Sequence, residues 1–299
     1  MLPLLSIVIA NYNYGRFLED AINSVVEQDG FDRCELIVVD GGSTDNSVDV
    51  IKKFANGLPP NTPRSEWHSS SPIPHPPSLI SWWCSERDKG QSDAFNKGFA
   101  HARGRLGCWV NADDLLLPGT LRAVLDCMEQ NQDVEWVTGG TIYFNEDFMI
   151  WRARIGTSIT RSMHRWVDPT VIGGPSSFFS IERLKEVGGF NLALHYMMDG
   201  DLWNKFFAAG MTMVHVQRYF WGFRAHSASK TSHAFYGRPS KTFNNEEKVL
   251  FKRVQYSRWG QRLRVLRLRL HKVMTGAIIR SYLDTKRYAG KNILKEFWG

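Results

Sequence analysis

The feature that most constrains the fold is an alternation of short, continuously apolar runs with stretches of helical spacing. Residues 4–10 and 34–40 are two such runs, and residues 15–28 between them have the helical period. Continuous apolar runs are typical of strands that are covered on both faces, as in a parallel sheet. The pattern continues with strand-like runs at 79–84, 106–111 and 134–138 and with helical stretches at 91–103 and from Pro118. The sequence therefore predicts an α/β fold with a doubly wound, Rossmann-like, mostly parallel sheet.

Composition narrows the class of protein. The 299 residues suffice for one large domain, and a hydrophobic content of 43% with 22% charged residues excludes disordered and collagen-like chains. No apolar run reaches the ~18 residues of a spanning helix, and residues 1–10 lack the basic stretch and long apolar core of a signal peptide. We therefore expect a cytoplasmic protein. Its four cysteines have no C-x-x-C spacing, which favours reduced, packed thiols over a disulfide or zinc framework.

The net charge of +7 is unevenly distributed. Residues 248–299 hold 14 Lys/Arg and two acidic residues, whereas residues 1–247 carry a net charge of −5. Within this tail, the apolar residues of a predicted basic amphipathic helix fall on one side: Leu263, Leu266, Leu270, Val273, Met274 and Ala277. Since the basic excess is confined to the tail, we expect no nucleic-acid partner.

The amphipathic tail has two interpretations. One is peripheral attachment, through residues 248–283, to an anionic membrane surface such as the inner face of the plasma membrane. That stretch holds ten Lys/Arg and no acidic residue. The other interpretation is that the apolar side packs on the body of the protein or on a second subunit, which makes an oligomer possible.

Polar residues follow the predicted strands at the edge where parallel α/β sheets bind ligands. They are the segments 11–13, 40–43, 86–91 and 111–114. No G-x-G-x-x-G follows the first strand, so a bound diphosphate would need another source of neutralising charge. The acidic pair Asp113 and Asp114 is one source, because adjacent carboxylates can hold a divalent cation that also binds phosphate oxygens. The alternative is that the pair is a plain helix cap.

Six ordered segments, from about residue 4 to residue 232, closely resemble the family 2 glycosyltransferases of the GT-A fold. They are SIVIANYNYGRFLEDAINSVVEQ, ELIVVDGGSTDNS, SERDKGQSDAFNKGFAHARG, WVNADDLLLPG, GGPSSFFSIERLKEVGGF and MMDGDLWNKF. The resemblance implies an inverting transfer of a sugar from a nucleotide sugar, usually UDP-linked, with Mn²⁺ or Mg²⁺ as cofactor. The acceptor would be a glycan or a lipid-linked glycan, as in the synthesis of bacterial surface polysaccharides.

The resemblance also implies roles for individual residues. Those matching nucleotide-sugar contacts are Ala10, Asn11, Tyr12, Asp40, Asp93, Asn96 and Asp113, and those matching metal ligands are Asp113, Asp114 and His226. Asp199 matches the general base. An inverting displacement needs a carboxylate that takes the proton of the acceptor hydroxyl, and Asp is ionised at neutral pH because its usual pKa is about 3.9. Asp201 would face away from Asp199 on a helix, and we expect it to be structural.

Two positions depart from the family pattern. Gly41 stands where the common D-D-G-S run has its second acid, and Asn111 stands where an aspartate is common. These departures leave open an alternative function, a nucleotide-sugar-binding module without catalysis.

The same patterns divide the chain into parts. Residues 1–142 are expected to form the nucleotide-sugar-binding α/β half, residues 143–247 the acceptor-binding and catalytic-base half of the same domain, and residues 248–299 a helical tail. Residues 57–78 are rich in proline and serine and read as a loop, either a lid or a linker. Ser43 or Thr44 is the expected N-cap of the helix that follows Asp40.

Overall fold

The computed structural model describes residues 2–56, 78–160, 163, 172–229, 241–246 and 258–299. Most of the proline-rich segment 57–78 lies outside these residues. Residues 247–257, which include the first ten residues of the basic tail, also lie outside the described residues. Among the described residues, no helix is both long enough and apolar enough to span a membrane.

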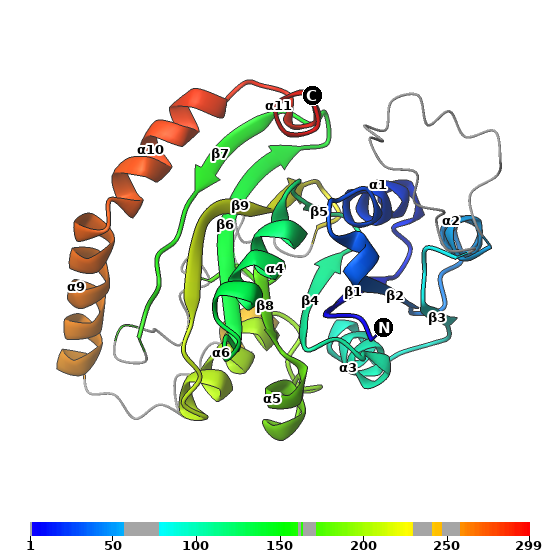
Figure 1. The fold of residues 1–299 in the computed structure, drawn as a ribbon, viewed down its shortest axis with the longest axis horizontal. Coiled ribbons are helices and arrows are strands. Elements are labelled where there is room, and N and C mark those ends of the chain that lie inside the picture. Colours follow the sequence, from blue (N-terminus) through cyan, green and yellow to red (C-terminus); the bar gives the residue numbers. More distant parts are fainter. Residues whose placement is uncertain (1, 57–77, 161–162, 164–171, 230–240, 247–257) are drawn as a thin grey trace.

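A nine-stranded sheet forms the centre of the fold, in the order β3-β2-β1-β4-β8-β6-β9-β5, with β7 paired to β6 (Figure 1). The strands are β1 Leu5–Asn11, β2 Cys34–Asp40, β3 Trp82–Ser85, β4 Leu106–Asn111, β5 Leu115–Leu116, β6 Trp136–Asn145, β7 Ile150–Arg154, β8 Ser177–Ser180 and β9 Val214–Ala225. The first four neighbours are parallel. The rest of the sheet is mixed, since β8 runs antiparallel to both β4 and β6 while β9 runs parallel to β6.

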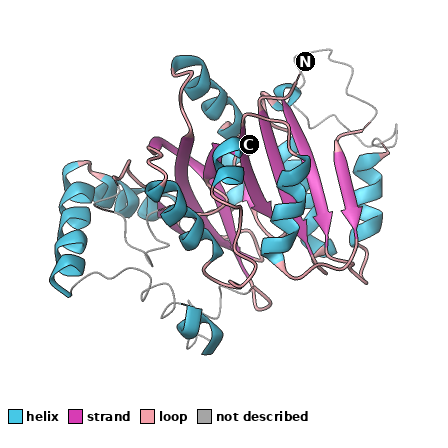
Figure 2. Cartoon of the chain, turned by 90° about the horizontal axis from the view of Figure 1, so that it is seen from below, coloured by secondary structure: helices cyan, strands magenta, loops and turns pink. Residues whose placement is uncertain are grey.

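Helices cover both faces of this sheet (Figure 2). They are α1 Gly15–Val26, α2 Ser47–Ala55, α3 Gln91–His101, α4 Thr120–Gln130, α5 Ile181–Glu186, α6 Met198–Ala208, α9 Arg258–Met274, α10 Ala277–Tyr288 and α11 Ile293–Phe297, with a 3₁₀ turn at Phe31–Arg33. One apolar cluster joins the sheet to α1, α2 and α4, and another joins it to α3, α5 and α6. The predicted α/β class is confirmed.

Strand β1 shows why the apolar runs are continuous. Ile7 and Ile9 belong to the cluster on the α1 side, whereas Val8 between them belongs to the cluster on the α3 side. All of them are fully buried. Each such side chain contributes about 1.5–3 kcal/mol by leaving water. A strand that gains this on both faces has no reason to alternate with polar residues.

Two helix starts differ from the prediction. Helix α2 begins at Ser47 with Asn46 at the N-cap position, so Ser43 and Thr44 do not cap it. Ser43 is instead bonded to the carboxylate of Asp40. Helix α4 begins at Thr120, after Gly119 in the left-handed region at φ 76°, rather than at Pro118.

The described part of the basic tail, residues 258–299, forms three helices, α9, α10 and α11, rather than one. Helices α9 and α10 are separated at Gly276, whose φ of 71° lies in the left-handed region that glycine tolerates best. Figure 1 shows them along the outer edge of the sheet, beyond β7.

Candidate functional site

The carboxyl ends of β1, β2 and β3 are tied together by Asp40, which is fully buried. Its Oδ1 accepts hydrogen bonds from Asn11 Nδ2 at 2.7 Å and from Ser43 Oγ at 2.5 Å. Its Oδ2 accepts from Ser85 Oγ at 2.6 Å and from the Ser43 backbone N–H at 2.9 Å. Because charge-assisted bonds of this kind are among the stronger ones, the strand ends are held in place before any ligand binds. Asn11 and Asp40, both predicted ligand contacts, therefore meet in one network.

Gly41 leaves a space that a neighbouring acid fills. A Cβ built on Gly41 would lie 2.7 Å from Asp88 Oδ2 and 3.3 Å from Tyr12 Cδ2. Asp88 Oδ1 accepts a hydrogen bond from the backbone N–H of Gly90 at 2.8 Å. Asp88 thus brings a carboxylate close to the position where the D-D-G-S pattern has its second acid. The sequence placed Asp88 in the polar segment 86–91 but gave it no role of its own, because only the tertiary structure brings the loop after β3 close to Gly41.

Three other residues predicted to contact the nucleotide sugar, Ala10, Tyr12 and Asp93, lie near the ends of β1, β3 and β4. Tyr12 is 60% exposed beside Asp88, and Ala10 pairs with Asn111 across β1 and β4. Asp93 lies in the first turn of α3, where its Oδ2 accepts from the backbone N–H of Lys89 at 3.0 Å.

Asn96 has a different partner from the predicted ribose. Its Nδ2 donates to the Phe190 carbonyl at 2.9 Å, and its Oδ1 accepts from the Phe190 N–H at 2.8 Å. The amide fastens α3 to the turn that follows α5, and a contact of Asn96 with the nucleotide sugar stays a prediction.

Asn111 explains how the chain tolerates an amide where an aspartate is common. Its Oδ1 accepts from Gln91 Nε2 at 2.8 Å, and its Nδ2 donates to Asp114 Oδ2 at 2.7 Å. An aspartate at this position would place a second carboxylate against Asp114, without the donor. The departure at Asn111 is therefore matched by its surroundings.

Asp114, predicted as a direct metal ligand, faces the interior instead. It is 1% exposed, and its Oδ1 accepts from the backbone N–H of Arg224 at 2.9 Å while Oδ2 accepts from Asn111. Burial, and secondarily the charge of Asp113, raise the pKa of Asp114 well above its usual range. Each carboxylate oxygen accepts a hydrogen bond from the protein, so Asp114 fixes the loop after β4, and its role as a metal ligand stays a prediction.

Asp113 and His226 come together from positions far apart in the sequence. His226 Nε2 lies 2.9 Å from Asp113 Oδ2. The histidine side chain is fully buried and that of Asp113 is 13% exposed. The rings of Phe17 and Tyr14 enclose the imidazole at centroid distances of 4.8 Å and 5.5 Å. His226 Nδ1 is buried without a hydrogen-bond partner among the described residues.

This pair fits a divalent cation as two of its ligands. Adjacent ligands of an octahedral ion, each about 2.1 Å from it, are about 3 Å apart, close to the separation of Asp113 Oδ2 and His226 Nε2. No cluster of three or more His, Cys, Asp or Glu side chains suited to a metal occurs in the described part of the chain. Any ion held here would therefore complete its coordination with ligand oxygens and water.

Arg224 is a buried residue that supports the loop after β4, which carries Asp113. The side chain is 2% exposed, and its Nε donates to the Asp113 carbonyl at 3.0 Å. Its guanidinium also forms an ion pair with Asp20 at 2.8 Å and lies over the Phe148 ring at 4.6 Å. Arg224 thus joins β9 to α1 and to the Asp113 backbone, which is a positioning role.

Asp199 lies in the first turn of α6 and is half-buried. Its carboxylate Oδ1 accepts a hydrogen bond from the backbone N–H of Gly200 at 2.7 Å. Burial raises the pKa of Asp199 to about 6, and backbone hydrogen bonds oppose the shift. A carboxylate with this pKa is ionised at neutral pH and is a stronger base than an ordinary aspartate.

Asp201 differs from Asp199 as predicted by their spacing. It is 3% exposed and forms an ion pair with Lys205 Nζ at 3.1 Å, one turn further along α6. The two acids of the segment therefore have different partners.

Glu246 is a further residue that sequence reasoning missed. Its carboxylate accepts from the backbone N–H groups of His195, Tyr196 and Met197 at 2.7, 2.8 and 3.0 Å. These groups immediately precede α6, where a negative charge is also favoured by the helix dipole. Glu246 is 7% exposed and about fifty residues away in sequence, so no local pattern reveals the contact.

The start of α3 links the two sides of the site. Gln91 bonds to Asn111 at the end of β4, and the next residue, Ser92, donates to Leu194 O at 3.2 Å and to Met198 Sδ at 3.4 Å. Met198 is adjacent to Asp199. The start of α3 thus contacts both Asn111 at the end of β4 and the residue that precedes Asp199 in α6.

Comparison with known sequences gives an independent view. The chain matches the family described as "Glycosyl transferase family 2" over residues 6–184. It is 37% identical over 130 residues to an uncharacterised glycosyltransferase of Nostoc sp., an alignment covering 44% of this chain and 34% of that protein. It is 27% identical over 142 residues to the minor teichoic acid biosynthesis protein GgaB of Bacillus subtilis, covering 47% of this chain and 14% of that one.

Solved structures share the fold. TarS 1–349 of S. aureus, in complex with UDP-GlcNAc, matches with a TM-score of 0.57 at 14% identity, over 82% of this chain and 65% of that one. The mannosyltransferase PcManGT of Pyrobaculum calidifontis, in complex with GDP-Man and Mn²⁺, matches with a TM-score of 0.54 at 19% identity, over 79% and 60%. In each of these alignments the chain spans less than two thirds of the relative.

Proposed function

The chain belongs to glycosyl transferase family 2, and from this premise we propose that it catalyses the inverting transfer of a sugar from a nucleoside-diphosphate sugar to an acceptor hydroxyl group. The observation that carries the proposal is the pairing of Asp113 with His226 at the strand edge that also holds the Asp40 network. Both the ion-binding and the nucleoside-binding chemistry expected of such a transferase thus have residues at the same end of the sheet.

We propose that the donor nucleotide is UDP. Its base and ribose would lie against Tyr12, with the Asp88 carboxylate available to accept from an N–H of the base and the Asp40 network behind it. The support is the position of Asp88 beside Gly41 and the complexes of the structural neighbours, one with UDP-GlcNAc and one with GDP-Man. Those two complexes hold different bases, so the base is a matter for direct test.

Mn²⁺ or Mg²⁺ would be held by Asp113 and His226. When bound, the ion supplies positive charge that stabilises the departing diphosphate. The protein prepares this site by burying the imidazole against aromatic rings and by fixing the Asp113 backbone through Arg224. Asp114 contributes indirectly, because it anchors the same loop to β9.

Asp199 would act as the general base. In the proposed step, its carboxylate takes the proton of the acceptor hydroxyl while that oxygen forms a bond to the anomeric carbon. The bond from this carbon to the phosphate oxygen breaks, and its electron pair leaves with the diphosphate. The raised pKa of about 6 suits the role, because a base is most effective when its pKa approaches the working pH.

The acceptor is proposed to be a glycan or a lipid-linked glycan of a bacterial surface polysaccharide. The support is the family and the likeness to GgaB, whose name places that protein in minor teichoic acid biosynthesis. Pocket residues for the acceptor are not assigned, because specificity of this kind depends on loop geometry.

A ligand-induced stability assay tests the proposal directly. Thermal unfolding is followed with UDP, GDP, CDP and dTDP, with and without Mn²⁺, and then the release of the nucleoside diphosphate is measured with the matching sugar donors. A ligand at about 100 times its Kd adds about 2.7 kcal/mol of stability. We expect UDP to raise Tm, more so with Mn²⁺, and UDP-sugars to be turned over. Binding without turnover of any donor would instead indicate a nucleotide-sugar-binding module.

A further inference from the structure

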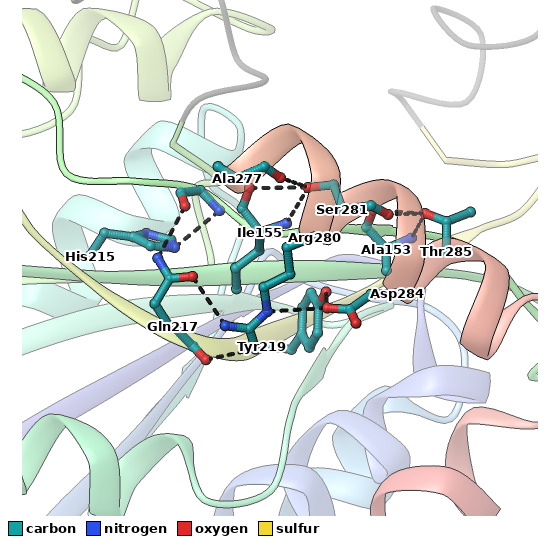
Figure 3. A network of polar contacts seen from close by, with 11 residues as sticks. Ala153, Ile155, His215, Gln217, Tyr219, Ala277, Arg280, Ser281, Asp284 and Thr285 are labelled. Atoms are coloured by element: carbon teal, nitrogen blue, oxygen red, sulfur yellow. Dashed lines mark hydrogen bonds and ion pairs between the residues drawn. The ribbon is translucent and has the colours of Figure 1, made fainter. Parts of the chain in front are cut away.

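Helix α10 attaches to the sheet through hydroxyl groups, in addition to Ala277 and Tyr288 at its two ends, which pack in an apolar cluster. Thr285 Oγ1 accepts from the Ala153 N–H and donates to the Ala153 carbonyl, both at 3.0 Å. Ser281 Oγ accepts from the Ile155 N–H at 3.0 Å and lies 3.3 Å from the Ile155 carbonyl. Figure 3 shows these contacts along β7 and the residues just after it. The helix therefore satisfies backbone groups at an edge that a further strand would otherwise cover.

Charged and aromatic-hydroxyl groups complete the same inner side of α10. Arg280 donates to the side chain and to the carbonyl of Gln217, each at 3.2 Å. Asp284 accepts from the hydroxyl of Tyr219 at 2.5 Å and from Arg280 Nε at 3.4 Å. Figure 3 shows both residues directed toward β9. Arg280, Ser281, Asp284 and Thr285 thus attach α10 to the protein, whereas Lys286 and Arg287 are exposed.

The apolar positions of α10 are directed away from the protein. Four large apolar side chains between 278 and 283 are each about half exposed: Ile278 46%, Ile279 59%, Tyr282 58% and Leu283 56%. Ala277, by contrast, is buried. A helix of a soluble protein normally buries its apolar stripe and exposes its polar one. In α10, by contrast, the large aliphatic side chains are exposed, whereas Ser281, Asp284 and Thr285 contact the protein.

Helix α9 continues the same arrangement. Leu268 is buried in the core and His271 Nε2 lies 2.8 Å from the Ser158 carbonyl, so these residues attach the helix. Five of its other apolar residues, from 263 to 274, are exposed: Leu263 48%, Leu266 53%, Leu270 53%, Val273 55% and Met274 84%. Together with the four residues of α10 they form what we call the outer apolar face. Scattered exposed apolar residues are ordinary, but nine that recur at intervals of three or four residues along two successive helices mark an interaction surface.

The charge around the outer apolar face indicates what covers it. Residues 258–288 contain nine Lys/Arg and a single acid, Asp284, which is bonded to Tyr219. Arg262, Arg267, Arg269, Lys286 and Arg287 are exposed on the same two helices. A second copy of the chain would bring like charges against one another, which is unfavourable. An anionic lipid surface offers both an apolar layer and the complementary charge.

We propose that the outer apolar face docks α9 and α10 into the interface of an anionic lipid bilayer. In this arrangement the half-exposed apolar side chains enter the boundary between headgroups and acyl chains, and the arginines and lysines remain among the phosphates. The hydroxyl contacts of α10 keep the catalytic body attached to the docked helices. The proposal rests on these helices alone and not on the proposed transferase chemistry.

Flotation of the purified full chain with vesicles tests this. Phosphatidylcholine vesicles with and without phosphatidylglycerol are compared for the wild type and for Ile279→Gln/Leu283→Gln. We expect binding to the anionic vesicles only, weakened at least tenfold by the double substitution, since each buried CH₂ contributes about 0.8 kcal/mol. Raising the ionic strength from about 0.1 M to about 1 M shortens the Debye length from about 10 Å to about 3 Å and should release the protein.

Matched controls distinguish a loss of membrane binding from a loss of folding. Leu2→Gln/Leu192→Gln removes two leucines that are 76% and 51% exposed outside the tail, and this variant should float like the wild type. Tm is measured for each variant. Equal flotation of Ile279→Gln/Leu283→Gln and wild type would overturn the proposal, as would an absence of wild-type flotation. A lipid-free dimer that the same substitutions dissociate would assign the face to a second copy.

Discussion

The two sides of the candidate site differ in how their carboxylates are satisfied. On the donor side, Asp40 accepts four hydrogen bonds and Asp114 accepts two, all from the protein. On the other side, Asp199 is bonded to a neighbouring backbone N–H and has a raised pKa. Burial also differs, since Asp40 and Asp114 are at most 1% exposed, whereas Asp199 is half-buried. We therefore expect Asp40 and Asp114 to fix the geometry of the strand ends and Asp199 to be the acid that receives a proton.

Replacing Asp199 should give the largest effect and the clearest separation of the two sides. For Asp199→Asn we expect turnover to fall by about a thousandfold, because an amide cannot take the hydroxyl proton. Nucleotide binding, measured by calorimetry, should stay within about twofold. Asp201→Asn is the matched control, which should lose stability with the Lys205 ion pair but keep most turnover. Unchanged turnover in Asp199→Asn would remove this residue from the mechanism.

Replacing Asp113 should affect nucleotide binding, whereas replacing Asp199 should affect turnover. Asp113→Asn should weaken the Mn²⁺-dependent part of UDP binding by about a hundredfold, since an amide is a poor substitute for a carboxylate ligand. His226→Gln should act in the same direction, by about tenfold or more. Calorimetric titrations with and without Mn²⁺ measure both. If metal dependence survives in both variants, the cation lies elsewhere.

The pH dependence of turnover should follow the ionisation of Asp199. Asp199 is protonated below its pKa of about 6 and ionised above it, so turnover should rise through pH 6 and be about tenfold lower at pH 5 than at its plateau. The stability dependence has the opposite sign: the folded state holds this proton more tightly than the unfolded state, so this group's contribution to stability falls as pH rises from about 4 to about 6. Asp199→Asn should lose that stability dependence. A turnover profile that is flat between pH 5 and pH 7 would contradict the assignment.

Replacing Asp88 tests whether its carboxylate binds the nucleotide or has only a structural role. Asp88→Ala should weaken UDP binding about tenfold, because a hydrogen bond to a charged group contributes about 1.5–3 kcal/mol. Turnover at saturating donor should change little. Asp133→Ala, at an exposed position after α4, is the control and should bind UDP normally. Normal UDP binding by Asp88→Ala would show that the carboxylate beside Gly41 does not contact the nucleotide.

Glu246 should give the smallest effect, and one confined to the side of Asp199. Glu246→Gln keeps the shape but weakens three charge-assisted bonds to the backbone before α6, so we expect a several-fold lower kcat with little change in UDP affinity. The free energy of unfolding should fall by about 1–2 kcal/mol. Steady-state kinetics and chemical denaturation measure these. A loss of UDP affinity with kcat intact would place Glu246 on the donor side instead.

Much of the donor half could be predicted from the sequence because its signals are local. Strands β2 and β4 have the predicted bounds, since an uninterrupted apolar run is itself the driving force for a strand buried on both faces. Asn11 and Asp40 were expected at the strand ends, and register alone brings them side by side. Asp88 and Glu246 could not be found in this way, because their partners are set by loops and by contacts across the fold.

For the basic tail, the sequence predicts the helices but not which of their sides contacts the protein. The spacing of residues 258–288 by itself determined that the helices have an apolar side and a basic composition. Only the tertiary structure decided which side turns outward. The physical reason is the edge at β7, where Ser281 and Thr285 hydrogen-bond to the backbone of Ile155 and Ala153. This contact turns the side of α10 that carries Ile279, Tyr282 and Leu283 away from the protein.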